Sequence, residues 1–401
     1  MCKIGWLLFA LGAAFSTSSA LRFGEYPFGV AEVLVVLGTI LLSRVIWVDV
    51  VNGAFDKKVS ALLVLIWASY AIGSLFGWGF LGGDAGKFRD CAALSYALVF
   101  AFVYHVLLRR GLAIGVWSER TLLLFVLLVT VAGGWLAYLG FDLFYSSSRL
   151  SGFAKNPNQF ALLAAAGLAL ALRVESRRRA DFVLKTISCL AFSFLGMMSG
   201  SDAFTVSLIA GVGAFFFFKY FKSGLILGFI LAPVIFTAAI VLGQYIHQQV
   251  VEYVITMYEM GNQGQVRVDL WSNGIKAWVG SPLFGWGFGS HSGLVGPFEG
   301  SEAHNTFIDV AAASGMTGLL GLVSIIWMAF AKNRSLGVRV GIVILVVFSF
   351  FHYTIRHPLY WVVLIGALTI GEGARQRAMM GAPLNNRMLP DASCRGRRRE
   401  G

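Results

Sequence analysis

Residues 261–318 contain the side chains whose types and spacing could do chemistry. Arg267 stands in a stretch with few basic residues, and a glycine-rich turn, FGWGFGS, surrounds Trp286. His304 and Asn305 follow, directly before the next apolar run. A guanidinium binds phosphate oxygens through paired hydrogen bonds, and an imidazole titrates near neutral pH. The interval therefore offers an anion-binding group and a proton-transfer group.

The composition is that of a membrane protein. Of the 401 residues, 57% are hydrophobic and only 13% are charged, which is too apolar for a soluble domain. The formal net charge is +12, but the basic residues gather in some of the connections between apolar runs, so we expect no nucleic-acid partner. The four cysteines lack the spacing of a metal site or disulfide framework, and no DxD sequence occurs. We predict no metal and no cofactor.

Apolar runs of roughly 20 residues, the length of one bilayer crossing, predict about twelve transmembrane helices. We expect nine in residues 1–243 and three in residues 306–373, separated by a long connection, residues 244–305. The predicted spans are 4–20, 28–47, 59–80, 91–108, 121–140, 158–174, 183–199, 203–218, 224–243, 306–331, 337–353 and 357–371. The predicted fold class is an all-α polytopic membrane protein.

The distribution of basic residues predicts that both termini are cytoplasmic. Most of the 32 Lys and Arg residues lie in alternate connections and at the ends of the chain, and cytoplasmic loops retain such residues. Residues 374–401 are basic and lack apolar periodicity, so we predict a disordered cytoplasmic tail. The same argument places residues 244–305 on the outer side of the membrane.

The long outer connection contains two helical patterns. Apolar residues recur at helical spacing from Ile246 to Tyr258, which predicts an amphipathic helix on the membrane surface. A second helix is predicted over residues 266–279, and the Gly-Ser-Pro sequence at 280–282 would end it.

Arginines on the outer side are informative, because an unpaired charge at the bilayer edge is costly. Arg89, Arg149 and Arg356 each precede a predicted span there, and Arg267 lies in the outer connection. Their guanidinium groups could converge on one cavity and bind phosphate. The alternative for each arginine is local, either contact with lipid head groups or an ion pair such as Arg89 with Asp90.

The other polar candidates also have two interpretations. In RLSGFAKNPNQFA, residues 149–161, Asn158 either caps the following helix or meets a sugar hydroxyl. The turn around Trp286 lacks the lysine of a nucleotide-binding loop, which favours a tight re-entrant turn. His304 is either a structural histidine or a titrating group at the membrane boundary.

Six segments occur in this order along the chain: RLSGFAKNPNQFA, MMSGSDAFTVSLIAG, VRVDLW, SPLFGWGFGS, AHNTFIDVAAASGMTGLLG and HYTIRHPLYW. They cover about residues 145–365. Together, in this order, they resemble the superfamily of O-antigen ligases and O-antigen polymerases. The resemblance implies a fold similar to the GT-C glycosyltransferases, in the bacterial inner membrane. It places the outer connection in the periplasm, as a loop with amphipathic helices.

The resemblance also implies substrates and roles. Such proteins take a glycan from undecaprenyl diphosphate, so the expected donor is an undecaprenyl-diphosphate-linked oligosaccharide and the expected acceptor is another glycan or the lipid A core. Arg267 matches the arginine expected at the donor diphosphate, and His304 matches the histidine expected beside the acceptor. Arginines would then stabilise the leaving diphosphate without a metal. The expected substrate-binding residues are Arg149, Asn158, Arg89, Arg356, Asn305 and Trp286.

The chain departs from the family at Ser201 and Asp202, where members commonly have Ser-Arg. The missing arginine favours an O-antigen or other polysaccharide polymerase, working with a chain-length regulator, over a lipopolysaccharide O-antigen ligase. Arg149, Arg89 or Arg356 would supply the missing charge. A twelve-helix transporter or flippase is a further alternative, but a carrier would need polar residues near the bilayer midplane.

Overall fold

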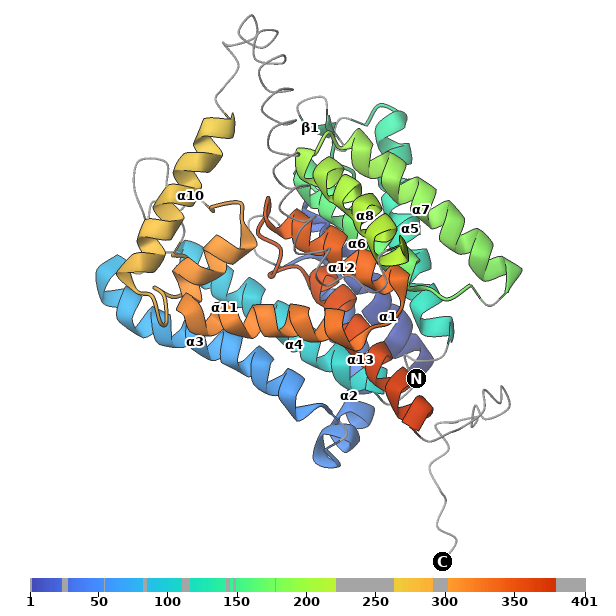
Figure 1. Cartoon of the computed structure of the whole chain (residues 1–401), viewed down its shortest axis with the longest axis horizontal. Coiled ribbons are helices and arrows are strands. Elements are labelled where there is room, and N and C mark those ends of the chain that lie inside the picture. The colour runs from blue at the N-terminus through green and yellow to red at the C-terminus, as the bar shows by residue number, and fades with distance from the viewer. Residues whose placement is uncertain are drawn as a thin grey trace, which may run out of the picture.

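The structure, a computed structural model, is an all-α bundle (Figure 1). It describes residues 2–23, 28–53, 55–81, 85–109, 116–141, 145–146, 149–176, 178–220, 263–290 and 302–379. The helices in these residues are α1 (Cys2–Phe15), α2 (Val30–Val51), α3 (Lys57–Leu81), α4 (Ala85–Arg109), α5 (Val116–Tyr138), α6 (Pro157–Arg173), α7 (Arg179–Met198), α8 (Asp202–Tyr220), α10 (Gln263–Gly280), α11 (Thr306–Lys332), α12 (Leu336–Ser349) and α13 (Pro358–Met379). A 3-10 turn, η1 (Ser19–Leu21), follows α1, and β1 (Tyr145–Ser146) pairs antiparallel with β2 (Arg149–Leu150).

Long apolar helices with apolar outer faces confirm the membrane-protein class. Among the described helices, α2, α3, α4, α5, α7, α8 and α11 are long and apolar enough to cross a bilayer. Large apolar side chains point outward from them: Leu75 is 74% exposed, Trp47 69% and Ile209 66%. Lipid would cover such surfaces, which would be costly in water. The chain is therefore a polytopic membrane protein.

The predicted spans fall on described helices, of which seven are long and apolar enough to cross a bilayer, so the predicted number of twelve is confirmed only in part. Each predicted span overlaps one helix, except 224–243, which lies outside the described residues. The predicted surface helix between Ile246 and Tyr258 also lies outside them. The helix predicted over residues 266–279 is confirmed as α10, which ends at Gly280. The last helix, α13, continues past the predicted tail boundary at Gly373 to Met379.

Helix α6 forms the centre of the bundle because it is apolar on every side. Its residues from Phe160 to Ala171 are all buried, and it contacts α5, α7, α8, α12 and α13. Small residues allow close approach: a Cβ on Gly341 of α12 would lie 3.0 Å from Ala169 Cα. The cap of α6 is Asn156, which accepts a hydrogen bond from the backbone of Asn158, so the capping role considered for Asn158 was wrong.

The tight turn predicted around Trp286 is confirmed, and it fills a break in α11. Gly315 interrupts that helix with φ 63° and ψ −164°. Trp286 N donates to Ala312 O (3.0 Å) on one side of the break, and Met316 N donates to Pro282 O (2.8 Å) on the other. The turn thus satisfies backbone groups that the broken helix cannot pair within itself.

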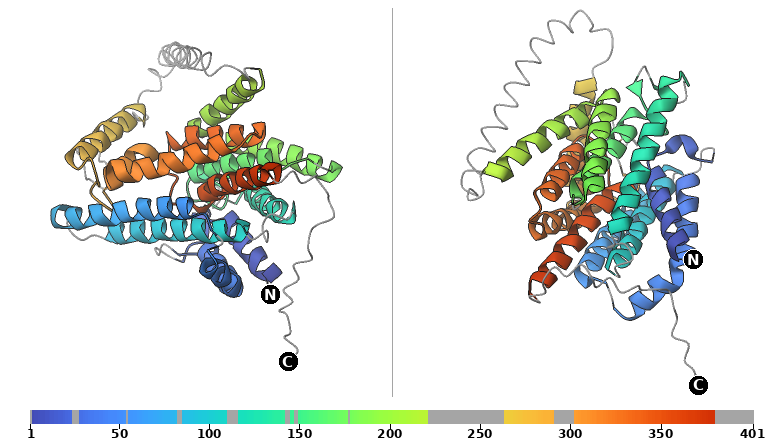
Figure 2. Two further views of the ribbon diagram at one scale, coloured as in Figure 1. Left: turned by 60° about the horizontal axis from the view of Figure 1, so that its bottom comes forward. Right: turned by 90° about the vertical axis from the view of Figure 1, so that its right-hand side faces the viewer.

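Helix α3 covers the other side of this turn. Phe288 N donates to Ser74 Oγ at 3.0 Å. A Cβ on Gly77 would lie 2.0 Å from Trp286 O, so α3 approaches the turn as closely as a glycine permits. Figure 2 shows α3, α4 and α11 running side by side, with α10 at one end of them. The turn therefore fixes the C-terminal end of α10 against α3 and α11.

Ion pairs join helix ends at the end of the bundle where α4, α6 and α11 finish. The sequence predicts this end to be cytoplasmic. Asp56, between α2 and α3, lies 3.8 Å from both Arg109 of α4 and Lys332 of α11. Arg173, the last residue of α6, pairs with Glu119 of α5 at 3.2 Å. Arg109, Lys332 and Arg173 are thus each paired with a carboxylate from another segment of the chain.

We predict that Gly315→Ala destabilises the protein. Its φ and ψ fall in a region that is essentially restricted to glycine, and an added Cβ would lie 2.3 Å from the Leu283 backbone. The strain costs about 1–3 kcal/mol, which would lower the thermal unfolding midpoint in detergent. Gly213→Ala on α8 is the matched control, because a Cβ there meets no atom within 4 Å. An unchanged midpoint for Gly315→Ala would contradict the prediction.

Candidate functional site

His304 has a fixed backbone position directly before α11. Its φ of 50° is the one positive value at a non-glycine residue in the described part of the chain. On one side, Ala303 N donates to Asp309 Oδ1 at 2.9 Å. On the other, the Asn305 side chain caps α11 and accepts from two backbone N–H groups at 3.0 and 3.2 Å. Such a conformation costs of order 1 kcal/mol or more, and these contacts maintain it. Asn305, predicted to bind substrate, is thus the N-cap of α11.

His304 stacks on His352, which lies in the loop between α12 and α13. The ring centroids are 5.9 Å apart and the planes differ by 19°. Thr306 Oγ1 donates to His352 O (2.5 Å), and Thr354 N donates to Thr306 Oγ1 (2.9 Å), so this loop is fastened to the first turn of α11. The sequence prediction missed His352, although this histidine was visible in HYTIRHPLYW, in a connection predicted to lie on the outer side.

Helix α10 turns Arg267 toward the same place. Its buried residues Leu270, Asn273 and Ala277 recur at helical spacing, and α10 packs on α11. Arg267 lies three residues before Leu270 and is itself half-buried, so it continues the packed face.

Charged groups from three elements act on the His304 imidazole. Burial lowers the pKa of His304, Glu302 partly opposes this, and the positive charges of Arg267 and Arg356 add to it. Arg267, His304 and Arg356, all predicted site residues, are therefore brought within electrostatic range of one another. A lowered pKa keeps the imidazole neutral at neutral pH, so its unprotonated ring nitrogen is able to accept a proton.

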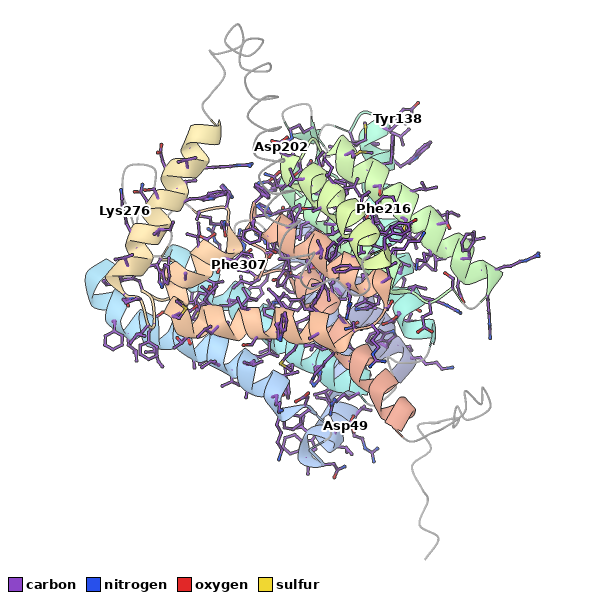
Figure 3. All side chains as sticks on the ribbon, viewed as in Figure 1. Asp49, Tyr138, Asp202, Phe216, Lys276 and Phe307 are labelled. Atoms are coloured by element: carbon purple, nitrogen blue, oxygen red, sulfur yellow. The ribbon has the colours of Figure 1, made fainter. Side chains whose placement is uncertain are left out.

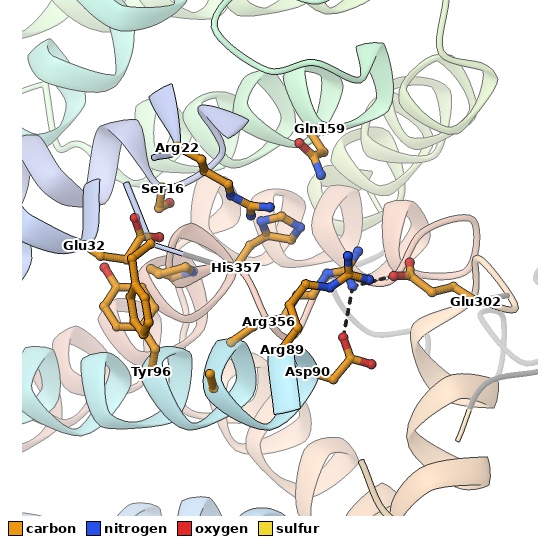
Figure 4. Close-up of a pocket in the computed structure, with 14 residues that line it drawn as sticks. Ser16, Arg22, Glu32, Arg89, Asp90, Tyr96, Gln159, Glu302, Arg356 and His357 are labelled. Carbon is orange, nitrogen blue, oxygen red and sulfur yellow. Dashed lines mark ion pairs between the residues drawn. The ribbon is translucent and has the colours of Figure 1, made fainter. Parts of the chain in front are cut away.

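Arg356 connects three of the helix ends around the site. Its guanidinium pairs with Glu302 and lies 3.9 Å from Asp90 of α4 (Figure 4). It also stands over the Tyr353 ring at 5.2 Å. Burial by itself would lower the pKa of Arg356, but the two carboxylates raise it overall. Arg356 is therefore a fixed cation whose charge is already shared with protein carboxylates.

Arg149 and Asn158 lie together at a second place, the turn between α7 and α8. Arg149 Nε donates to Ser199 O (2.9 Å), and its Nη2 donates to Asn158 Oδ1 (3.3 Å). A Cβ on Gly200 would lie 3.2 Å from Arg149 Nε. The guanidinium thus lies against the turn that leads to Asp202, which is exposed at the start of α8 (Figure 3).

The remaining predicted residues, Arg89 and Trp286, are not among the groups found to act on His304. Arg89 is exposed at the start of α4 and lines a pocket with Arg22, a basic residue that the sequence prediction did not single out. Burial lowers the pKa of Arg22, and the charges of Arg356 and Arg89 add to this effect while Glu32 opposes it. Trp286 Nε1 donates to Ala277 O at 2.7 Å, which fixes the turn to α10.

A comparison with protein families finds a match in the middle of the chain. A family model described as O-antigen ligase (Wzy_C) matches residues 187–323. Residues 187–323 are an O-antigen ligase domain of the Wzy_C family. The domain contains Arg267 and His304, and the resemblance seen in the sequence is confirmed. The family implies glycan transfer of the O-antigen ligase or polymerase type. None of the curated proteins compared with the chain matches it.

In the described ranges, no group of three or more His, Cys, Asp and Glu side chains is placed to hold a metal ion. The O-antigen ligase domain thus presents arginine and histidine side chains at its candidate site.

We predict that His304 titrates below its ordinary value of 6.5 and that its neighbours set this pKa with opposite signs. Arg267→Gln removes a positive charge and should raise the His304 pKa, whereas Glu302→Gln removes a negative charge and should lower it. The measurement is an NMR titration of ¹³C-labelled histidine in nanodiscs, with the His304 resonance assigned from its loss in His304→Gln. A His304 pKa of 6.5 or above, or one unaffected by Arg267→Gln, would contradict this description of the site.

Proposed function

We propose that the chain transfers an undecaprenyl-diphosphate-linked oligosaccharide to a glycan acceptor at the periplasmic face of the bacterial inner membrane. We favour a polysaccharide or O-antigen polymerase. The observation that carries this proposal is that Arg267 and His304, both inside the O-antigen ligase domain, act on each other electrostatically at one end of the bundle. An anion-binding group beside a neutral imidazole is what diphosphate departure and hydroxyl attack require.

The proposed reaction is a single displacement. An acceptor hydroxyl attacks the anomeric carbon of the lipid-linked sugar, the bond from that carbon to the diphosphate oxygen breaks, and the configuration inverts. His304 accepts the proton of the attacking hydroxyl, a role worth roughly 100- to 10,000-fold in rate. Arg267 stabilises the negative charge that develops on the departing undecaprenyl diphosphate, and we propose that no metal is needed.

The proposed orientation rests on the two ends of the bundle. The His304 loop and the N-terminal ends of α4 and α13 meet at one end, which the basic-residue pattern predicts to be periplasmic. Asp56, Arg109 and Lys332 meet in ion pairs at the predicted cytoplasmic end. We therefore propose about twelve spans in a GT-C-like arrangement, with cytoplasmic termini and a periplasmic loop over residues 244–305.

A lipopolysaccharide O-antigen ligase is the second candidate, and Arg149 favours it. The argument for a polymerase is the absence of arginine at Asp202. Arg149 donates to Ser199 O and so brings a positive charge to the same turn. In a ligase the acceptor would be the lipid A core, whereas a polymerase would extend the glycan and work with a chain-length regulator.

We predict that Arg267→Ala and His304→Ala each abolish glycan transfer, with a loss of roughly 100-fold or more for His304. Lys276→Ala, an exposed residue on the same helix as Arg267, is the matched control and should retain activity. The measurement is gel analysis of glycan ladders in a deletion strain that expresses each variant, with membrane levels checked by immunoblot. Normal ladders from both site variants would contradict the assignment.

The deletion strain also separates the two candidates. Loss of a polymerase leaves lipopolysaccharide with a single repeat unit. Loss of a ligase leaves a bare core, while lipid-linked polymer accumulates.

A further inference from the structure

A pocket of about 220 Å³ lies among the helix ends next to the His304 loop (Figure 4). Its walls come from the residue after α1, the N-terminal ends of α2, α4, α6 and α13, and Glu302. Arg267 and His304 are not among its lining residues, yet Glu302 and Arg356, which are, both act on the His304 imidazole. The pocket therefore adjoins the proposed transfer site without including it.

The fixed charges that line this pocket balance one another. Arg356 pairs with Glu302 and lies 3.9 Å from Asp90. Glu32 accepts a hydrogen bond from Gly29 N at 2.7 Å and opposes the charge of Arg22. The lining arginines and carboxylates are equal in number: Arg22, Arg89 and Arg356, and Glu32, Asp90 and Glu302. A diphosphate would bring negative charge into a pocket whose lining has no net positive charge to pair with it. The pocket therefore suits a neutral ligand.

Polar groups that both donate and accept hydrogen bonds also line the pocket. Ser16 Oγ, Tyr96 OH and His357 Nε2 are buried and have no hydrogen-bond partner within the described ranges. Ser16 is 9% exposed and His357 only 4%. The two hydroxyls carry no charge, and the ring nitrogens of a neutral histidine both donate and accept. Neutral buried groups of this kind match the hydroxyls of a sugar, which also donate and accept.

A fixed amide in the lining and the size of the pocket indicate a single sugar ring. Ser19 Oγ donates to Gln159 Oε1 at 2.9 Å, which fixes the orientation of the lining Gln159 amide. At about 220 Å³ the pocket is smaller than the roughly 300–1,000 Å³ of sites for drug-sized ligands. A single sugar ring is therefore a better fit than an oligosaccharide.

We infer that this pocket binds one neutral sugar ring of the acceptor glycan, with Ser16, Tyr96 and His357 as its hydrogen-bonding groups. The identity of the ring as part of an acceptor rests on the proposed function. With the ring in the pocket, the acceptor hydroxyl lies on the side of Glu302 and His304. The diphosphate of the donor lies outside the pocket, toward Arg267.

The test is saturation-transfer NMR on the purified full-length protein in lipid nanodiscs. The probes are the methyl pyranosides of glucose, galactose, mannose, rhamnose and N-acetylglucosamine, with inorganic pyrophosphate as competitor. We expect at least one glycoside to bind and pyrophosphate not to displace it. Tyr96→Phe and Ser16→Ala each remove one hydroxyl and should weaken binding roughly three- to tenfold. Tyr360→Phe and Ser188→Ala, buried hydroxyls outside the lining, are the matched controls.

Three results would overturn the inference: no binding by any glycoside, binding that Tyr96→Phe and Ser16→Ala leave unchanged, or displacement by pyrophosphate. The assay needs no turnover, so its outcome is separate from that of the proposed function. Glycoside binding in a protein whose deletion leaves glycan ladders intact would contradict the transfer activity alone. If deletion removes the glycan ladders but the purified protein binds no glycoside, only the proposed sugar-binding role of the pocket is contradicted.

Discussion

The largely buried ion pairs of Arg356 with Glu302 and Asp90 connect the ends of α4, α11 and α13. Within a bilayer the hydrophobic effect does not drive helices together, so packing and polar contacts determine which helix ends meet. Loss of one partner would leave a buried charge uncompensated, at a cost of about 3–5 kcal/mol. The position of the His304 loop and the shape of the adjoining pocket both depend on this link.

The same charges that fix the loop also set its chemistry. Glu302 favours the protonated imidazole of His304, while burial, Arg267 and Arg356 disfavour it, and the neutral form results. The backbone of His304 has a conformation that a non-glycine residue rarely adopts, and the Asn305 cap and the Asp309 contact stabilise it. Strain and a buried titratable group at one residue are costs that a protein tolerates at a functional site.

Much of the fold could be predicted from the sequence, because a bilayer crossing leaves an apolar run that composition reveals. Arg267 and His304 could be chosen by residue type and by their position on the predicted outer side, where basic residues are rare. The stacking of His352 on His304 could not, since spacing along the chain does not say which loops meet at the end of a bundle. For the same reason the sequence could not show that Arg356 pairs with Glu302 and Asp90, or that Trp286 donates a hydrogen bond to Ala277 of α10. The substrate-binding roles of both residues stay predictions.

The central claim, that Arg267 and His304 face one lipid-linked donor, is tested most directly by cryo-electron microscopy of the protein in nanodiscs with undecaprenyl diphosphate. We expect the diphosphate to contact the Arg267 guanidinium, with the His304 ring facing the space beside it and the isoprenoid chain following the apolar helices outward. A diphosphate bound beside Asp56 and Lys332 at the other end of the bundle, or away from Arg267 at its own end, would contradict the account.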